Sequence, residues 1–247
     1  MAWNLKTEER GEGRKIALKE KGIYDANPKL KIQCKIDPLI MMEAVRNCKA
    51  HNIKIGAHPG LPDLQGFGRR EMKLSPEELT AITVYQVGAL KGFLDREGVP
   101  LHHVKPHGIL YGMMCRDYEV AKAVMLGIPK GIPVFGLAGT NMEKAAKDLG
   151  IPFWAELYGD VKYRADGSLV IDRKKKPWDL ADVEKHVTQQ VRTQSVTAVD
   201  GTQVNLPMGD YPVSICCHSD SPGCVGIIGK TREVVDKFNK DREAGIV

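Results

Sequence analysis

The chain has 247 residues, and 43% of them are hydrophobic, which is enough to build one barrel-sized domain with a full core. Its formal net charge is +5, but lysine and arginine are dispersed outside residues 173–176 and only 6% of residues are aromatic, which argues against a nucleic-acid-binding protein. No apolar run approaches the roughly 18 to 20 residues that a membrane span needs, which argues against a membrane protein.

The cysteines and the front of the chain indicate a cytoplasmic protein. The six cysteines show no paired spacing, and the first 30 residues are too charged for a secretory leader. We therefore expect a reducing compartment and no disulfides. The basic run 173–176 is expected to be a solvated loop, although such a surface would attract anionic substrates.

The chain divides into an unpatterned front and a patterned remainder. Residues 1–32 form an atypical N-terminal segment that we expect to be poorly ordered, and residues 33–247 form one domain. Strand-like and helix-like stretches alternate through that domain, which is typical of β/α units around a parallel sheet.

The apolar spacing predicts the individual elements in chain order. Ser75, Pro76 and Glu78 form a capping box, which is a strong helix start. Helices are expected at 38–50, 76–94, near 119–126, at 142–149, at 180–192 and from about 231. Strands are expected to end at His58 and near His107, and to cover 132–137, 151–157, 168–171 and 213–218.

Three of the seven histidines stand where a predicted strand meets a loop. His58, His107 and His218 each have Pro and Gly nearby, and Lys105 precedes His107. A lone histidine is more often a packed core residue, but three repeats of one design predict convergence on one pocket at the carboxyl face of a barrel.

The other four histidines have less distinctive positions. His51 and His186 fall in helical patterns and are expected at the surface. Strand alternation points only one of His102 and His103 inward.

Gln86 and the loop 138–141 offer two weaker signals. Gln86 stands among apolar residues on a predicted helix, so its amide needs a partner, for which a backbone carbonyl is favoured over a substrate. The loop holds Gly139 before a helix and suggests a phosphate site, but it lacks a complete phosphate-binding motif.

Glu156 and Asp160 follow one predicted strand and are candidates for acid and base. Two carboxylates can take these roles if their surroundings separate their pKa values. A salt bridge from these acids to Arg164 or Lys162 is an equally good reading of the same residues.

Several long motifs in one order resemble the LamB/YcsF family, which is the family of the 5-oxoprolinase A subunits and lactam-utilisation proteins. The motifs occupy 55–70, 85–90, 104–111, 156–173 and 214–220, and the likeness covers roughly residues 34–240. The resemblance implies an α/β fold, a distorted parallel β/α barrel of the TIM type, as in carbohydrate deacetylases and glycoside hydrolases. It also implies ATP-dependent opening of 5-oxoproline, or a related lactam, to the amino acid, with partner 5-oxoprolinase subunits.

The resemblance and the residue chemistry together give a candidate site. ATP, with magnesium, is the expected co-substrate that activates the lactam; a bound divalent metal and a homo-oligomer stay open. The candidate catalytic residues are His58, Lys105, His107, Asp160, His218 and Asp220. The candidate substrate- or nucleotide-binding residues are Asp37, Asp63, Arg69, Arg70, Gln86, Tyr111, Gly139 and Glu156.

The front of the chain departs from the family pattern. The family begins with a strand bearing Asn-Cys-Asp and Gly-Glu, followed by Ala-Cys-Gly-Phe-His-Ala-Gly-Asp-Pro, whereas here only Gln33 to Pro38 corresponds and Asp37 alone carries over. Two alternatives to the hydrolase therefore stay open: a binding or scaffold subunit without chemistry, and a metal-dependent deacetylase whose His and Asp activate water.

Overall fold

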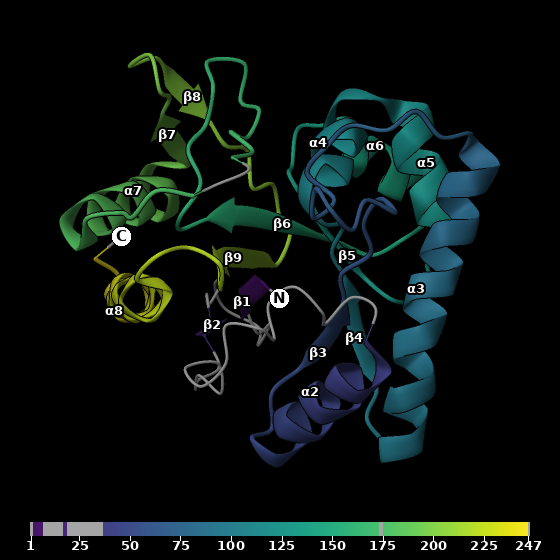
Figure 1. Cartoon of the computed structure of the whole chain (residues 1–247). Helices are drawn as coiled ribbons and strands as arrows, with labels where there is room; N and C mark the ends of the chain where they lie inside the picture. The colour runs from purple at the N-terminus through teal and green to yellow at the C-terminus, as the bar shows by residue number, and fades with distance from the viewer. Residues whose placement is uncertain (1, 7–16, 19–36, 173–174, 247) are drawn as a thin grey trace. The chain divides into compact units, whose positions relative to one another are not determined.

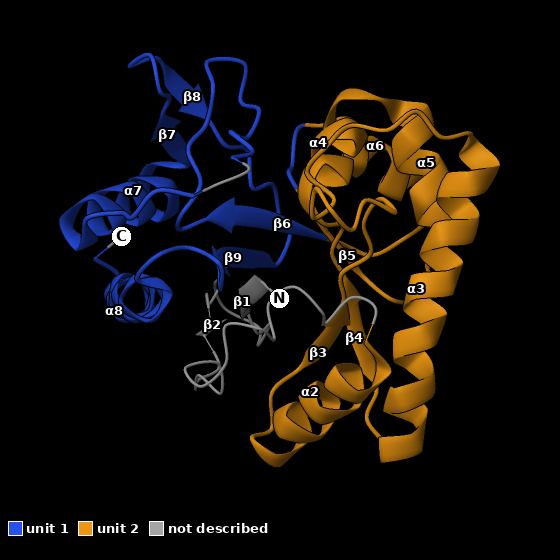
Figure 2. Ribbon diagram, viewed as in Figure 1, with its two compact units in different colours: residues 1–19, 137–139, 154–247 blue, residues 20–136, 140–153 orange. Residues whose placement is uncertain are grey.

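The computed structural model describes residues 2–6, 17–18, 37–172 and 175–246, with the backbone alone for 2–6 and 17–18. The chain forms two compact units (Figure 2): unit 1 holds residues 1–19, 137–139 and 154–247, and unit 2 holds 20–136 and 140–153. The domain boundary predicted at residue 32 lies outside the described residues. The single barrel domain after it stays a prediction.

The described part of unit 2 contains three parallel strands that alternate with helices (Figure 1). Strand β4 (Leu101–Val104) lies between β3 (Ile55–Ala57) and β5 (Val134–Gly136). The helices, in chain order, are α2 (Pro38–Ala50), α3 (Pro76–Glu97), α4 (Gly108–Arg116), α5 (Tyr118–Leu126) and α6 (Asn141–Asp148). This alternation of parallel strands and helices is the arrangement that the sequence predicted.

The long helix α3 shows how local chemistry sets an element. The Ser75 side chain accepts from the Glu78 amide while the Glu78 side chain accepts from the Ser75 amide, so the predicted capping box is confirmed. The helix runs past the predicted Leu94 to Glu97 and ends because Gly98 adopts φ 65°. Leu94 packs with Val45 of α2 in a buried apolar cluster.

Unit 1 is built around two parallel strands. Strand β6 (Phe153–Tyr158) pairs with β9 (Val213–His218), placing Glu156 opposite Ser214. On its other edge β9 pairs antiparallel with β1 (Ala2–Lys6), which pairs with β2 (Ala17–Leu18). Helices α7 (Leu180–Thr193) and α8 (Cys224–Glu243) pack together, and a hairpin joins β7 (Ser195–Thr197) to β8 (Gln203–Asn205).

Two predicted elements of unit 1 were wrong. Residues 168–171 form no strand, because Leu169 makes only an isolated bridge to Tyr163. The last helix begins at Cys224 and not near Thr231, since Gly226 and Gly229 weaken its apolar pattern in the sequence. Packing of its buried stripe of Ile227, Thr231, Val235 and Phe238 stabilises the early turns.

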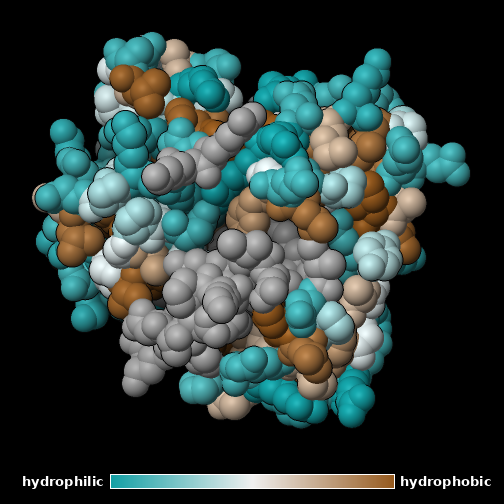
Figure 3. Space-filling model, viewed as in Figure 1, coloured by the Kyte–Doolittle hydropathy of each residue, from teal (hydrophilic) through white to brown (hydrophobic). Residues whose placement is uncertain are grey.

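The face drawn in Figure 3 is largely hydrophilic with separate apolar patches. Val84 and Tyr85 on α3 are among the exposed large apolar side chains. The five cysteines within the described ranges form no disulfide with one another, and no helix in those ranges has the length and apolarity to span a bilayer.

Candidate functional site

His58 and His107 contact each other directly in unit 2. His58 follows β3, and His107 stands between β4 and α4. His107 Nδ1 lies 3.0 Å from His58 Nε2, and the rings meet edge-on with centroids 4.8 Å apart. The outer nitrogens face backbone carbonyls: His58 Nδ1 lies 2.5 Å from Lys105 O, and His107 Nε2 lies 2.7 Å from Phe67 O.

Close backbone approaches hold this region together. The His103 ring stacks on Phe135 at 4.0 Å between centroids and covers Gly56, where an added Cβ would lie 2.2 Å from the ring. Gly108 adopts φ 58°, and a Cβ there would lie 2.5 Å from Gly68 O. Burial, followed by the charges of His102 and Lys105, lowers the pKa of His103 well below its ordinary value. As predicted, one member of the 102–103 pair points inward.

The loop after His58 carries an ion pair. Asp63 accepts from the Gly66 amide at 2.9 Å and binds the Arg70 guanidinium, with Arg70 Nε donating to Asp63 Oδ2 at 3.0 Å. The hydrogen bond from Arg70 holds the pKa of Asp63 at about 2. In the described structure Asp63 contacts no imidazole, so it orients the loop and not a histidine.

Other candidates of unit 2 have structural partners. The Arg69 guanidinium lies 5.1 Å from the centroid of the Phe67 ring, whose edge meets His107. Gln86 donates to Gly60 O at 2.7 Å and accepts from Gly60 N at 3.0 Å, which confirms the predicted backbone partner. Asp37 caps α2 by accepting from the Leu39 and Ile40 amides. Lys105 and Tyr111 are buried.

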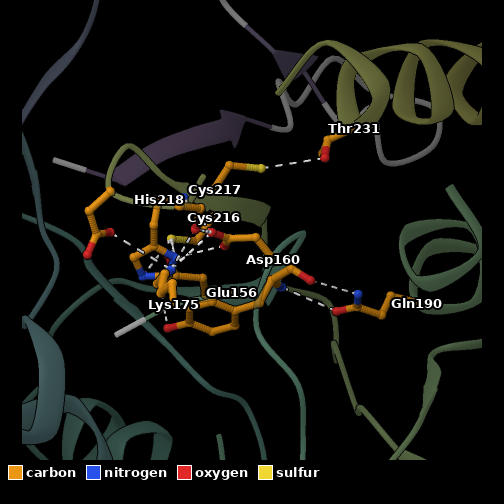
Figure 4. Close-up of polar contacts among 11 residues, drawn as sticks. Glu156, Asp160, Lys175, Gln190, Cys216, Cys217, His218 and Thr231 are labelled. Carbon is orange, nitrogen blue, oxygen red and sulfur yellow. Dashed lines mark hydrogen bonds and ion pairs between the residues drawn. The ribbon is translucent and has the colours of Figure 1, made fainter. Parts of the chain in front are cut away.

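Asp160 is the centre of a polar cluster in unit 1 (Figure 4). His218 Nδ1 lies 2.8 Å from Asp160 Oδ1, and the His218 amide donates to Oδ2 at 3.1 Å. Lys175 Nζ donates at 3.0 Å to Asp160 Oδ2 and at 3.0 Å to Ser221 Oγ, and the Ser221 hydroxyl also donates to Asp160. Asp220 lies at the edge, 3.9 Å from Lys175 Nζ.

These contacts keep Asp160 ionised and fix the proton on His218. Burial alone would raise the pKa of Asp160, but the charge and hydrogen bond of His218, then Lys175 and Ser221, lower it well below its ordinary value. A carboxylate only accepts, so His218 Nδ1 carries the hydrogen. In the neutral imidazole Nε2 is therefore the basic nitrogen, and it lies 3.8 Å from Cys216 Sγ.

Lys175 and Ser221 were missed by the sequence analysis. The basic run was expected to be solvated, yet the Lys175 side chain is only 11% exposed. The predicted salt-bridge partners were also wrong: Arg164 donates to Leu169 O, and the Lys162 ammonium lies over Trp178. No local spacing links Lys175 to Asp160, which are 15 residues apart. The sequence signal that could have indicated the pair was a run of cations not far along the chain from the end of strand β6.

The paired strands β6 and β9 present further polar groups. Tyr158 OH donates to Glu156 Oε2 at 3.0 Å, and Glu156 is buried. Ser214, its register partner, is fully buried, and its hydroxyl has no hydrogen-bond partner among the described residues. Gln190 holds the Tyr158 backbone by donating to its carbonyl at 2.9 Å and accepting from its amide at 3.2 Å.

His186 corrects a sequence prediction. It was expected at the surface, but it packs against Trp178 and Tyr163, with ring centroids 5.1 and 6.0 Å away. Burial lowers the pKa of His186 to about 4. His51, by contrast, is exposed at the end of α2, as predicted.

The described residues give little support to the phosphate site suggested at loop 138–141 or to a bound metal ion. Gly139 adopts φ 78°, and the Thr140 hydroxyl caps α6 by accepting from the Met142 amide at 3.2 Å, which uses one of the helix-end donors. Within the described ranges no three His, Cys, Asp or Glu side chains gather so that they can hold a metal ion. The metal-dependent alternative therefore has no ligand set in this part of the chain.

Three comparisons place the chain among known proteins. The model of the LamB/YcsF family matches residues 35–244. The chain is 82% identical to the "Lactam utilization protein lamB" of Emericella nidulans over 204 residues, covering 83% of this chain and 81% of that protein. It is 40% identical to the A subunit of 5-oxoprolinase from Thermus thermophilus over 202 residues, covering 80% of this chain and 79% of that protein.

A solved structure supports the fold class. The crystal structure of a lactam utilization protein from Thermus thermophilus matches with a TM-score of 0.70 and 39% identity, covering 81% of each chain. The predicted α/β class, a distorted β/α barrel with parallel strands, is confirmed. The convergence of His218 with His58 and His107 stays a prediction.

Proposed function

Since the chain belongs to the LamB/YcsF family, we propose that it takes part in ATP-dependent hydrolytic opening of 5-oxoproline or a related lactam. The proposal includes further subunits, because relatives about 40% identical are named as the A subunit of 5-oxoprolinase. The observation that carries it is the 82% identity with a lactam utilization protein over 204 residues. In its broader form, the proposal is that the chain has a role in lactam metabolism.

The reaction has three chemical needs. A lactam is a resonance-stabilised amide, so its opening requires a polarised carbonyl, an activated nucleophile and a proton for the leaving nitrogen. ATP supplies the driving force by phosphorylating the lactam oxygen, which releases ADP. One water then attacks the activated carbon as the ring nitrogen leaves with a proton, and a second water hydrolyses the resulting acyl phosphate to the carboxylate and phosphate. The sum consumes two waters and gives the open amino acid, ADP and phosphate.

His218 suits the role of the base that activates water. Asp160 accepts from Nδ1, so Nε2 of the neutral ring is positioned to take a proton. The same nitrogen, once protonated, can return the proton to the leaving amine. His58 and His107 differ because each of their four ring nitrogens already faces a backbone carbonyl or the other ring. We therefore assign proton transfer to His218.

Lys175 is the positioning residue of this base. It bonds both Asp160 and Ser221, so it holds the carboxylate in the orientation that receives His218. The Lys175 ammonium also balances the charge of the buried Asp160 carboxylate, which would otherwise be costly. Asp220 lies close enough to orient Lys175 in turn.

Cations elsewhere suit the anionic parts of the substrates. Lys105 and Arg69 are assigned to offset phosphate charge, and Glu156, Tyr111 and Gly139 remain binding candidates. Magnesium would travel with ATP as part of the substrate. These assignments rest on residue chemistry and on the family resemblance.

Reconstitution tests the proposal. The purified chain is combined with its candidate partner subunits, ATP, magnesium and 5-oxoproline, and glutamate and phosphate are measured. We expect both products in equal amounts, and their loss when this chain is left out or carries His218→Asn. If an intact relative turns over in the same assay while this chain does not, the hydrolase proposal fails and a scaffold role replaces it.

A further inference from the structure

The contact between His58 and His107 constrains how many protons the two rings hold. His58 Nδ1 faces Lys105 O at 2.5 Å, and His107 Nε2 faces Phe67 O at 2.7 Å. A carbonyl oxygen only accepts hydrogen bonds, so both of these outer nitrogens must carry a hydrogen. A pair of neutral imidazoles has two such hydrogens in total, and the carbonyls take both.

The two inner nitrogens then have no hydrogen between them. His107 Nδ1 and His58 Nε2 would face each other with lone pairs at 3.0 Å, which is a hydrogen-bond distance. Two lone pairs repel at this distance, whereas one shared proton converts the contact into a charge-assisted N–H···N bond. We infer that His58 and His107 form a proton-binding site that holds one proton between them and carries a single positive charge.

The surroundings both oppose and support this charge. The Arg69 guanidinium and the His107 ring both contact Phe67, and the charge of buried Lys105 acts on His103, so two cations of the unit disfavour the proton. The Asp63–Arg70 ion pair is internally neutral. The carbonyl dipoles of Lys105 and Phe67 each face a ring N–H and favour the charged form.

Backbone contacts help to fix the positions of both rings. The His107 amide donates to Pro59 O at 2.7 Å and the Lys105 amide to Ala57 O at 2.9 Å, which joins the ends of β3 and β4. The rings cannot separate without breaking these links or the carbonyl bonds. The shared proton is therefore a property of the fold and does not depend on the proposed lactam chemistry.

The charge of the His58–His107 pair therefore depends on pH. With its proton, the pair adds one positive charge at the ends of β3 and β4; without it, the pair is neutral and its inner contact is repulsive. All its N–H groups are used within the protein, so it attracts an anion by charge and not by direct bonds. Above the pH at which the proton leaves, two hydrogens remain for three contacts, so either the inner N···N contact or one of the carbonyl hydrogen bonds must be lost.

Histidine-selective ¹⁵N NMR of the full chain tests this inference. The wild type is titrated from pH 5 to 9, beside His107→Gln and a matched control, His51→Gln, which removes an exposed histidine. We expect His58 and His107 to titrate together, with three N–H hydrogens at pH 6, and this joint titration to be unchanged in His51→Gln. In His107→Gln the midpoint of His58 should fall by about one pH unit or more, since the acceptor of its shared proton is lost.

Two outcomes would overturn the inference. One is a wild-type spectrum at pH 6 in which both rings are neutral, with two N–H hydrogens in total. The other is independent titration of the rings, with the midpoint of His58 unchanged by His107→Gln. The wild-type spectrum decides the matter even if the variant does not fold, and neither result depends on enzyme activity.

Discussion

The two histidine sites differ in what their imidazoles face. In unit 2, His58 and His107 face two carbonyls and each other. In unit 1, His218 faces the carboxylate of Asp160, which Lys175 and the Ser221 hydroxyl also bind. The residue type is the same in both sites. The two backbone carbonyls require a hydrogen on the outer nitrogen of both His58 and His107, whereas the Asp160 carboxylate requires a hydrogen on Nδ1 of His218.

This difference separates two functions. A histidine whose second nitrogen is basic can move protons during a reaction, while a pair whose nitrogens are all engaged within the protein supplies a positive charge whose presence depends on pH. His186 gives a third case for comparison, because it is partly buried and its Nε2 has no hydrogen-bond partner among the described residues.

The largest effect is expected from Asp160→Asn. The amide cannot hold His218 in the same tautomer and leaves Lys175 without its carboxylate, so kcat should fall on the order of 10² to 10⁴-fold. The free energy of unfolding should fall by about 3 kcal/mol, because a buried ion pair loses one partner. Asp236→Asn, in an exposed pair on α8, is the control and should change stability by about 0.5 kcal/mol or less.

Acid should act through the same carboxylate. The pKa of Asp160 is lowered in the folded state, so its contribution to stability is fully present above the unfolded pKa of about 4. That contribution is lost as pH falls through the lower folded value. Urea unfolding at pH 7 and at pH 3 should therefore differ less for Asp160→Asn than for the wild type, and an equal difference would contradict the ionised state.

His186 should also cost stability in acid, for a different reason. The pKa of His186 is about 4 in the folded state, and its ordinary value is 6.5. Between these pH values the unfolded chain therefore binds a proton at His186 that the native state does not bind. Stability is therefore lost as pH falls from 6.5 to 4, by about 3 kcal/mol in total. In His186→Phe the ring contacts are kept and this loss should disappear from urea unfolding curves, whereas His51→Phe should leave it in place.

A smaller effect is expected beside the histidine pair. In Gly56→Ala the new methyl group would meet the His103 ring, which is held by Phe135, so we expect a loss of about 1 to 3 kcal/mol. Gly88→Ala is the matched control, since a Cβ there meets nothing within 4 Å on an exposed helix face. It should stabilise by about 0.5 to 1 kcal/mol. If Gly56→Ala and Gly88→Ala change the free energy of unfolding equally, the His103 ring moves aside at little energetic cost.

The smallest effect distinguishes a bonded lysine from its solvated neighbour. Lys175→Met should lower kcat about 10-fold and move the acid limb of the pH–rate profile to higher pH, because Asp160 then acts more strongly on His218. Lys176→Met removes the same charge from the exposed adjacent position and should change neither. Lys175→Arg should restore part of the rate, and an unchanged profile in Lys175→Met would remove its positioning role.

Local chemistry was predictable from the sequence, and long-range partners were not. Ser75 took the partner that its capping box predicts, because a cap is set within one helical turn. Gln86 took the kind of partner that was predicted, a backbone carbonyl, but the sequence did not show that Gly60, 26 residues away, supplies it. Lys175 lies 15 residues from Asp160 in a basic run, and only the folded loop brings them together. His186 follows Val183 by three residues, beside the buried stripe, and Trp178 and Tyr163 cover it in a way that helical spacing does not reveal.

The steady-state kinetics of His218→Asn and His107→Gln, measured side by side in the reconstituted 5-oxoproline assay, test the division between the two sites most directly. We predict that His218→Asn lowers kcat on the order of 10³-fold with little change in KM, because a proton-transfer group is lost. His107→Gln should raise KM about 10-fold and leave kcat within a few-fold, because the positive charge of the His58–His107 pair, which attracts anionic substrates, is lost. The reverse assignment, with kcat lost in His107→Gln and KM raised in His218→Asn, would contradict the account.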